Sequence, residues 1–320
     1  MDTSPDEWLE VTLQSQITQV EFPAMGNTVN LTVIGDSDLT LVARRRIDEL
    51  ESRWSRFRST SDIARLNHAE GRPTPVHPDT IRLVTSMVAA QRATNGVFDP
   101  TLTPALIASG YDRSMRDPGE TSSVATTTWS RVSLDATTFD DHFSALTLPY
   151  GATLDPGGLG KGLAADMVAE ELTDMGAEGV CISIGGDIRC AGTGPLEGLW
   201  PITVADPHDT RQNLATVLLE SGGIATSHVS AKTWMHSGNA VHHIFDPVTL
   251  APVAITRSSI VQATVIATEA AWAEVYATVA LVTQSTDQLR DEFGREFAAL
   301  LVSADGTETA VGQWKEFARD

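Results

Sequence analysis

The sequence is poor in cysteine, in basic residues and in long apolar runs. Its 320 residues include only two cysteines, Cys181 and Cys190, which are too few for a disulfide scaffold and lack the spacing of metal ligands. We interpret them as core or hairpin residues, with a disulfide between them as the alternative. No repeat or low-complexity linker divides the chain, and fibrous and collagen-like classes are excluded.

Basic residues are outnumbered by acidic ones. The chain has 22 Lys plus Arg against 42 Asp plus Glu, a formal charge of -20. Because affinity for a phosphate backbone comes mainly from Lys and Arg, we expect no nucleic-acid partner. A small phosphorylated ligand is compatible with this composition, provided that its site contains a lysine, backbone N–H groups or a metal ion.

Apolar runs are too short to cross a membrane. The most apolar segment, residues 266–282, contains Glu269 and Glu274 and falls short of the ~20 residues that a spanning helix needs. Residues 1–7 lack the apolar core of a secretory signal. We therefore expect no membrane span and a cytoplasmic location.

Strand and helix patterns are interleaved irregularly, which favours an α+β fold in a single domain. We place an N-terminal extension at residues 1–20 and the folded domain at residues 21–320. Alternating apolar residues predict a strand at 29–33. The helical spacing of Ile47, Leu50, Trp54 and Phe57 predicts one helix, and a second extends from Pro78 to a stop at 95–96.

The middle of the chain predicts a strand, a glycine loop, a helix and a hairpin in that order. These elements are the strand at 146–154, the loop at 155–162, the helix at 163–175 with Leu163, Met167 and Leu172 inward, and the hairpin at 180–191 around residues 185–187. An extended apolar run at 260–266 then leads into a helix at 267–282.

The glycine loop, DPGGLGKG at 155–162, resembles a phosphate cradle. Its glycines let backbone N–H groups approach an anion, and Lys161 adds a positive charge next to a helix N-terminus. Because Gly162 follows the lysine where Ser or Thr would stand, it is not a Walker A loop. The alternative is a tight strand-to-helix turn with a solvated lysine.

Two further segments carry candidate chemistry. Glu274 and Thr278 are four residues apart on one helix face, and a carboxylate with a hydroxyl suits Mg²⁺; a solvated helix face is the alternative. His242 and His243 point to opposite sides of an extended segment, so they do not share one metal ion easily. One of them could act as a general base at neutral pH, and a core histidine is the alternative.

Eight segments in this order resemble the ApbE family of FAD:protein FMN transferases, over about residues 21–282. They are 23–28 (PAMGNT), 61–67 (SDIARLN), 96–101 (GVFDPT), 155–162 (DPGGLGKG) with Asp166, 185–187 (GGD), 225–227 (ATS), 243–247 (HIFDP) and 273–274 (AE) with Thr278.

The resemblance implies a single-domain ApbE-like (T-fold-like) architecture and a role for each matched residue. Lys161 and His243 are then catalytic, with His243 as the base. Mg²⁺ is held by the main-chain oxygen of Gly158 and by Glu274 and Thr278. The implied FAD-binding residues are Met25, Phe57, Val97, Phe98, Asp99, Asp155, Lys161 and Phe245.

The chain departs from the family pattern at several positions. The metal-ligating acid is commonly Asp, and Glu274 is one methylene longer; Ala277 stands where some members have a further acid. His228 follows Ser227 where the family commonly has Gly, and Leu250 follows Thr249 where a Gly is usual. The implied metal position and turns therefore differ in detail.

The resemblance implies that the enzyme attaches FMN from FAD to a Thr or Ser of an acceptor protein and releases AMP. With an imidazole base, we expect activity to fall as the pH drops through the imidazole range. The alternatives are a Mg²⁺-dependent FAD pyrophosphatase, a non-catalytic FAD-binding protein and a scaffold without ligand. The sequence does not identify the acceptor or the oligomeric state.

Overall fold

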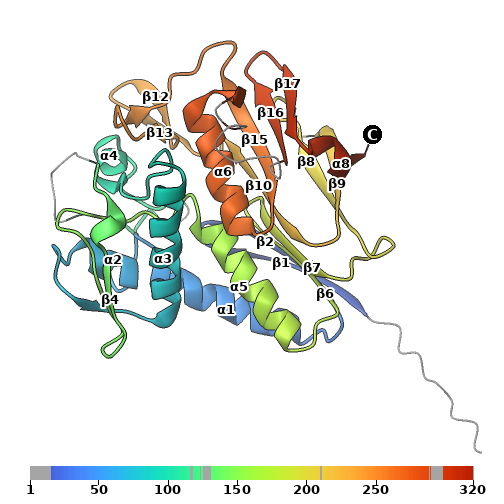
Figure 1. Cartoon of the computed structure of the whole chain (residues 1–320), viewed down its shortest axis with the longest axis horizontal. Helices are drawn as coiled ribbons and strands as arrows, with labels where there is room; N and C mark the ends of the chain where they lie inside the picture. The colour runs from blue at the N-terminus through green and yellow to red at the C-terminus, as the bar shows by residue number, and fades with distance from the viewer. Residues whose placement is uncertain are drawn as a thin grey trace, which may run out of the picture.

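The computed structural model describes residues 16–115, 118–122, 124, 131–209, 211–287, 289 and 298–319, and it is built around an eight-stranded antiparallel sheet (Figure 1). In spatial order the strands are β1 (Ile17–Ala24), β2 (Asn27–Ile34), β6 (Gly179–Ile184), β7 (Asp187–Gly192), β10 (Gly222–His228), β15 (Ile260–Ala267), β16 (Ala298–Ser303) and β17 (Glu308–Gly312).

Helices cover one face of this sheet, and a small sheet covers the other (Figure 1). Because side chains alternate along a strand, Val265 and Leu301 belong to the core on the helical side, whereas Ile266 and Leu300 pack with the small sheet. The helical side has α1 (Leu39–Trp54), α5 (Gly160–Asp174) and α6 (Ala270–Thr283), and the other has β8 (Trp200–Ala205), β9 (Asn213–Leu219), α8 (Trp314–Phe317) and β18 (Ala318–Arg319).

The remaining elements surround the helical side. They are α2 (Asp62–Asn67), β3 (Thr74–Pro75), α3 (Pro78–Ala93), α4 (Thr103–Ala108), the 3₁₀ turn η1 (Leu134–Ala136), β4 (Thr138–Asp140), β5 (Ala145–Thr147), β11 (Thr233–His236), β12 (Asn239–His242), β13 (Phe245–Asp246) and β14 (Ala251–Pro252). Within the described ranges, no helix has both the length and the apolar character needed to cross a membrane.

Several predicted elements agree with the structure. The mixed α+β architecture is confirmed, as are the strand around Val29 and the helix beginning at Pro78. The hairpin is formed by β6 and β7, whose turn at Gly185 and Gly186 has positive φ at both residues, as a type I′ hairpin turn requires. The cysteines face each other across this hairpin as free thiols, with 3.5 Å between their sulfur atoms.

Other boundaries differ from the prediction. The main sheet begins at Ile17, inside the predicted extension; residues 1–15 lie outside the described part. The first helix ends at Trp54, because Ser55 adopts an extended conformation, so Phe57 is not helical. The predicted strand at 146–154 is a strand only up to Thr147, because Pro149 accepts from Ala152 in a turn.

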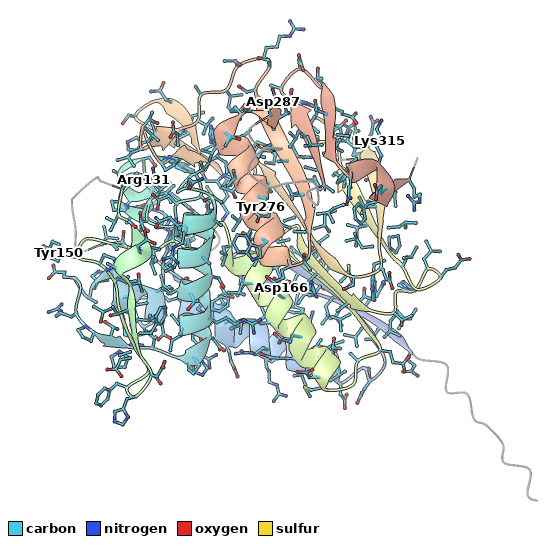
Figure 2. The ribbon with its side chains drawn as sticks, in the orientation of Figure 1. Arg131, Tyr150, Asp166, Tyr276, Asp287 and Lys315 are labelled. Carbon is cyan, nitrogen blue, oxygen red and sulfur yellow. The ribbon has the colours of Figure 1, made fainter. Side chains whose placement is uncertain are left out.

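Helix α5 begins at Gly160, three residues before the predicted Leu163, so Lys161 and Gly162 lie in its first turn. Gly162 in this first turn allows α6 to approach closely. An added Cβ on Gly162 would lie 2.5 Å from the main-chain oxygen of Ala270. Farther along α5, the Asp166 carboxylate accepts hydrogen bonds from the backbone N–H groups of Ala270 and Ala271, both at 2.9 Å (Figure 2). Asp166 therefore caps α6 and fixes it against α5.

Gly162→Ala is expected to lower the free energy of unfolding by about 1–3 kcal/mol, because the new methyl group meets main-chain atoms that cannot rotate away. Urea denaturation followed by circular dichroism measures this loss. The exposed residue Asp174 on the same helix offers a control, since Asp174→Ala should change stability by no more than about 0.5 kcal/mol. Equal stability of the two variants would contradict the close packing of α5 on α6.

Candidate functional site

A cavity of about 680 Å³ opens where the β1–β2 turn, the N-terminus of α5, the end of β10 and the inner face of α6 meet. We call it the central cavity. Every residue that the sequence analysis assigns to a site lines it: Met25, Phe57, Val97, Phe98, Asp99, Asp155, Gly158, Lys161, His243, Phe245, Glu274 and Thr278. The structure therefore brings these residues together, and the role of each stays a prediction.

Lys161 is held between two carboxylates from different elements. Its Nζ donates to Glu274 Oε1 on α6 at 2.5 Å, and to Asp187 Oδ2 at the start of β7. Burial lowers the pKa of Lys161, but the two negative charges raise it by more, so the lysine stays charged. Burial, followed by the charge of Glu274, raises the pKa of Asp187 against the opposing effect of Lys161.

Glu274 is almost completely buried, and both of its oxygens have partners. Oε1 accepts from Lys161, and Oε2 accepts from the backbone N–H of Gly162 at 2.8 Å. Thr278 lies on the same face of α6 and also lines the cavity. A Cβ added to Gly158 would lie 3.6 Å from Thr278 Oγ1, so the glycine loop closely approaches this hydroxyl.

The metal site predicted from the resemblance would rely on few side chains. Within the described ranges, no three His, Cys, Asp or Glu side chains are grouped to hold a metal ion. The nearby oxygen donors are the Glu274 carboxylate, the Thr278 hydroxyl and the main chain of Gly158. Two buried carboxyl groups, those of Asp187 and Glu274, share the single ammonium of Lys161. Hard oxygen donors of this kind fit Mg²⁺.

Asp155 opens the glycine loop, but its carboxylate bonds to the protein. Oδ1 accepts from the backbone N–H of Gly157 at 2.8 Å, and Oδ2 pairs with Arg56 Nε at 2.9 Å. The buried guanidinium of Arg56 lies over the rings of Phe57 and Tyr111, 4.2 and 4.6 Å from their centroids. Asp155 thus connects the loop to an aromatic wall of the cavity.

Asp99 and Asn67 also hold main chain in place beside the cavity. Asp99 Oδ1 accepts from the N–H and the hydroxyl of Thr101, at 2.9 and 2.7 Å, which orders the turn that carries Phe98. Asn67 forms two hydrogen bonds with the main chain of Leu154, directly before the glycine loop, at 2.6 and 2.9 Å. The predicted Asp99 therefore bonds within its own turn, and it also accepts from Gln91 on α3 at 3.1 Å and pairs with Arg131.

His243 lines the cavity and has one nitrogen that can accept a hydrogen bond. Its Nδ1 lies 3.3 Å from the carbonyl oxygen of Lys232, which only accepts, so Nδ1 carries the proton and Nε2 has the lone pair. Burial and then the positive charge of Lys232 lower the pKa of His243 to about 3, so the ring is neutral at pH 7. The neighbouring His242 bonds to the Val253 carbonyl at 3.0 Å instead.

The cavity lining also includes Arg56, Asp187, His228 and Lys232, which were given no role from the sequence. Asp187 directly follows the two glycines of the predicted hairpin turn. An acidic side chain at that turn was the sequence signal that could have indicated a role in the site. His228 stood out only as a departure from the family pattern, and nothing local marks Arg56 or Lys232. Arg56 reaches the cavity from the segment after α1, His228 from the last position of β10, and Lys232 from the segment after β10.

Comparison with known proteins agrees with this architecture. The model of the ApbE family matches residues 25–296. The FAD:protein FMN transferase of Salmonella typhimurium is 26% identical over 329 residues, covering 98% of this chain and 93% of that protein. That of Haemophilus influenzae is 24% identical and covers 75% of this chain and 74% of its own length.

Solved structures share the fold. The ApbE protein of Thermotoga maritima aligns with a TM-score of 0.81 at 22% identity, covering 95% of this chain and 100% of that one. The apo form of the Pseudomonas stutzeri flavinyl transferase ApbE gives a TM-score of 0.76 at 22% identity, covering 96% and 98%. The predictions of family, fold and transferase class are confirmed, and the chain belongs to the ApbE family.

Proposed function

We propose that the protein transfers FMN from FAD to a threonine or serine hydroxyl of an acceptor protein and releases AMP. The names of the curated relatives support the overall reaction. The observation that carries the proposal in this chain is the neutral His243, which has its lone pair on Nε2 and lines the same cavity as Lys161 and Glu274.

The proposed reaction is an attack on the FMN phosphorus of FAD. The acceptor hydroxyl forms a bond to this phosphorus, its proton passes to Nε2 of His243, and the bond to the bridging oxygen breaks so that AMP leaves. Lys161 and the N-terminus of α5 contribute positive charge next to the phosphates. Phe57, Phe98 and Phe245 offer apolar surface for the flavin ring.

Mg²⁺ is part of this proposal because the donors fit it. Glu274, Thr278 and the main-chain oxygen of Gly158 would hold the ion, and Asp187 shares the ammonium of Lys161 with Glu274. When bound, the ion would offset the charge that develops on the phosphate oxygens.

Intact mass spectrometry of a co-expressed flavin-acceptor domain tests the proposed function. Transfer adds the mass of FMN minus one water to the domain only when this protein is present. Free FMN with an unmodified domain would support the pyrophosphatase alternative, in which water replaces the hydroxyl. Retention of intact FAD would support a binding protein, and a colourless protein that never binds FAD would support a scaffold.

Glu274→Gln is expected to lower FMN transfer about 10²-fold or more, because the amide removes the charged oxygen donor. The amide can still accept from Gly162, so the thermal unfolding temperature should change little. Treatment of the wild-type protein with a chelator should reduce transfer similarly, and added Mg²⁺ should restore it. If chelator-treated protein turns over FAD at the untreated rate, the metal assignment is wrong.

A further inference from the structure

His228 presents a second imidazole to the central cavity, at the end of β10. Its Nδ1 receives two hydrogen bonds from Ser230: the backbone N–H at 3.2 Å and the hydroxyl at 2.7 Å. A backbone N–H can only donate, so Nδ1 must be unprotonated. The neutral ring therefore carries its proton on Nε2. This tautomer is the reverse of that in His243.

The Nε2–H group of His228 is a fixed donor without a partner of its own. No hydrogen bond to this nitrogen is formed within the described part of the chain, and the half-buried ring lines the cavity. Rotation of the ring by 180° would break both bonds from Ser230, and exchange of the tautomer would break the bond from its backbone N–H. The turn itself is closed by a hydrogen bond from the N–H of Ala231 to the carbonyl of His228 at 3.1 Å. The position of the donor is thus set before any ligand binds.

The surroundings of His228 indicate an anionic ligand. The same turn carries Lys232 into the cavity, and the Lys232 carbonyl holds His243. On the preceding strand, Ala225 pairs with Asp187, the partner of Lys161. The end of β10 therefore lies in the part of the cavity that contains Lys161 and Lys232, whereas the phenylalanines come from other segments. Polar donors grouped in this way suit phosphoryl oxygens better than a flavin ring.

We infer that His228 is a substrate-binding residue whose Nε2–H donates a hydrogen bond to a phosphoryl oxygen of the dinucleotide. This inference rests on the proposed function, because it takes FAD as the ligand. The two cavity histidines then have complementary tasks. His243 accepts a proton through its lone pair, and His228 holds the phosphoryl group with its proton.

Binding of FAD and of riboflavin, measured by flavin fluorescence, tests the inference. Riboflavin has the same ring system but no phosphate. His228→Leu is expected to weaken FAD binding about 10- to 100-fold, as loss of a hydrogen bond to a charged group does, and to leave riboflavin binding unchanged. His228→Gln keeps an amide N–H donor at a similar reach and should retain most of the FAD affinity. His142→Leu, the same change at an exposed histidine outside the cavity lining, should have no effect.

An equal loss of FAD and riboflavin affinity in His228→Leu, or no loss of either, would overturn the inference. A wild-type protein that binds FAD but leaves the acceptor unmodified would instead overturn the proposed function alone.

Nitrogen-15 NMR of histidine-labelled protein, assigned through His228→Leu, gives a test that needs no ligand. Nε2 should resonate as a protonated nitrogen and Nδ1 as an unprotonated one, and the reverse pattern would overturn the assignment.

Discussion

Replacing His243 with alanine is expected to lower the rate of FMN transfer about 10²- to 10⁴-fold, the usual cost of losing a general base. FAD binding should stay near the wild-type value, because the predicted contacts with FAD come from other residues. Single-turnover transfer and FAD titration separate the two effects. His242→Ala is the matched control and should transfer far better, since His242 bonds to the Val253 carbonyl and does not line the cavity. A reversed order of the two variants would show that another group takes the proton.

The acidity of His243 also changes the expected pH dependence. The sequence alone predicts a loss of activity through the ordinary imidazole range, but burial and the charge of Lys232 lower the pKa of His243 to about 3. In the free enzyme, the loss of kcat/KM at low pH should therefore occur below the ordinary imidazole range. The His243 ring takes up a proton near pH 6.5 in the unfolded chain but only near pH 3 in the folded chain. The contribution of the neutral ring to the free energy of unfolding is therefore lost as the pH falls between these values. Lys232→Met should raise the pKa and move the acid limb to higher pH.

Lys161→Met is expected to abolish FAD binding and to lower the free energy of unfolding by about 3–5 kcal/mol, because it leaves the buried carboxylates of Asp187 and Glu274 without their shared cation. From the sequence alone, this change is expected to weaken binding without affecting the fold. The structure alters that expectation, since the lysine is a buried ion-pair partner rather than a solvated side chain.

Urea denaturation at pH 7 measures the loss in Lys161→Met. The double variant Lys161→Met with Asp187→Asn removes one of the two uncompensated carboxylates and should recover part of the lost stability, while FAD binding stays weak. Wild-type stability in the single variant would contradict a charged, buried network. Full recovery of FAD binding in the double variant would contradict a direct role for the ammonium.

Local patterns in the sequence were sufficient for some elements of the site and not for others. The four-residue spacing of Glu274 and Thr278 places both on one face of α6, and that inference needs no knowledge of the rest of the chain. The contact of Lys161 with Asp187 and Glu274 joins α5, β7 and α6, so no short window contains it.

Errors in the predicted elements have similar causes. Phe57 has helical spacing with Trp54, yet the chain leaves the helix at Ser55, where Arg56 becomes buried against Phe57 and Tyr111. Tertiary contacts of this kind override a local period. The matching of eight ordered segments to a family, by contrast, uses information from the whole chain, which is why it indicated cavity residues that no local pattern singles out.

The pairing of β2 with β6 has a consequence for the order in which the protein folds. These neighbouring strands end at Ile34 and begin at Gly179, so the sheet cannot extend beyond β2 until the ribosome has delivered β6. A nascent chain that ends before Gly179 contains the glycine loop but lacks Asp187, His243 and Glu274. Closure of so distant a pair is slow, and intermediates in larger proteins expose strand edges. We therefore expect flavin to stabilise only the completed chain, after synthesis, and to give no protection to shorter nascent intermediates.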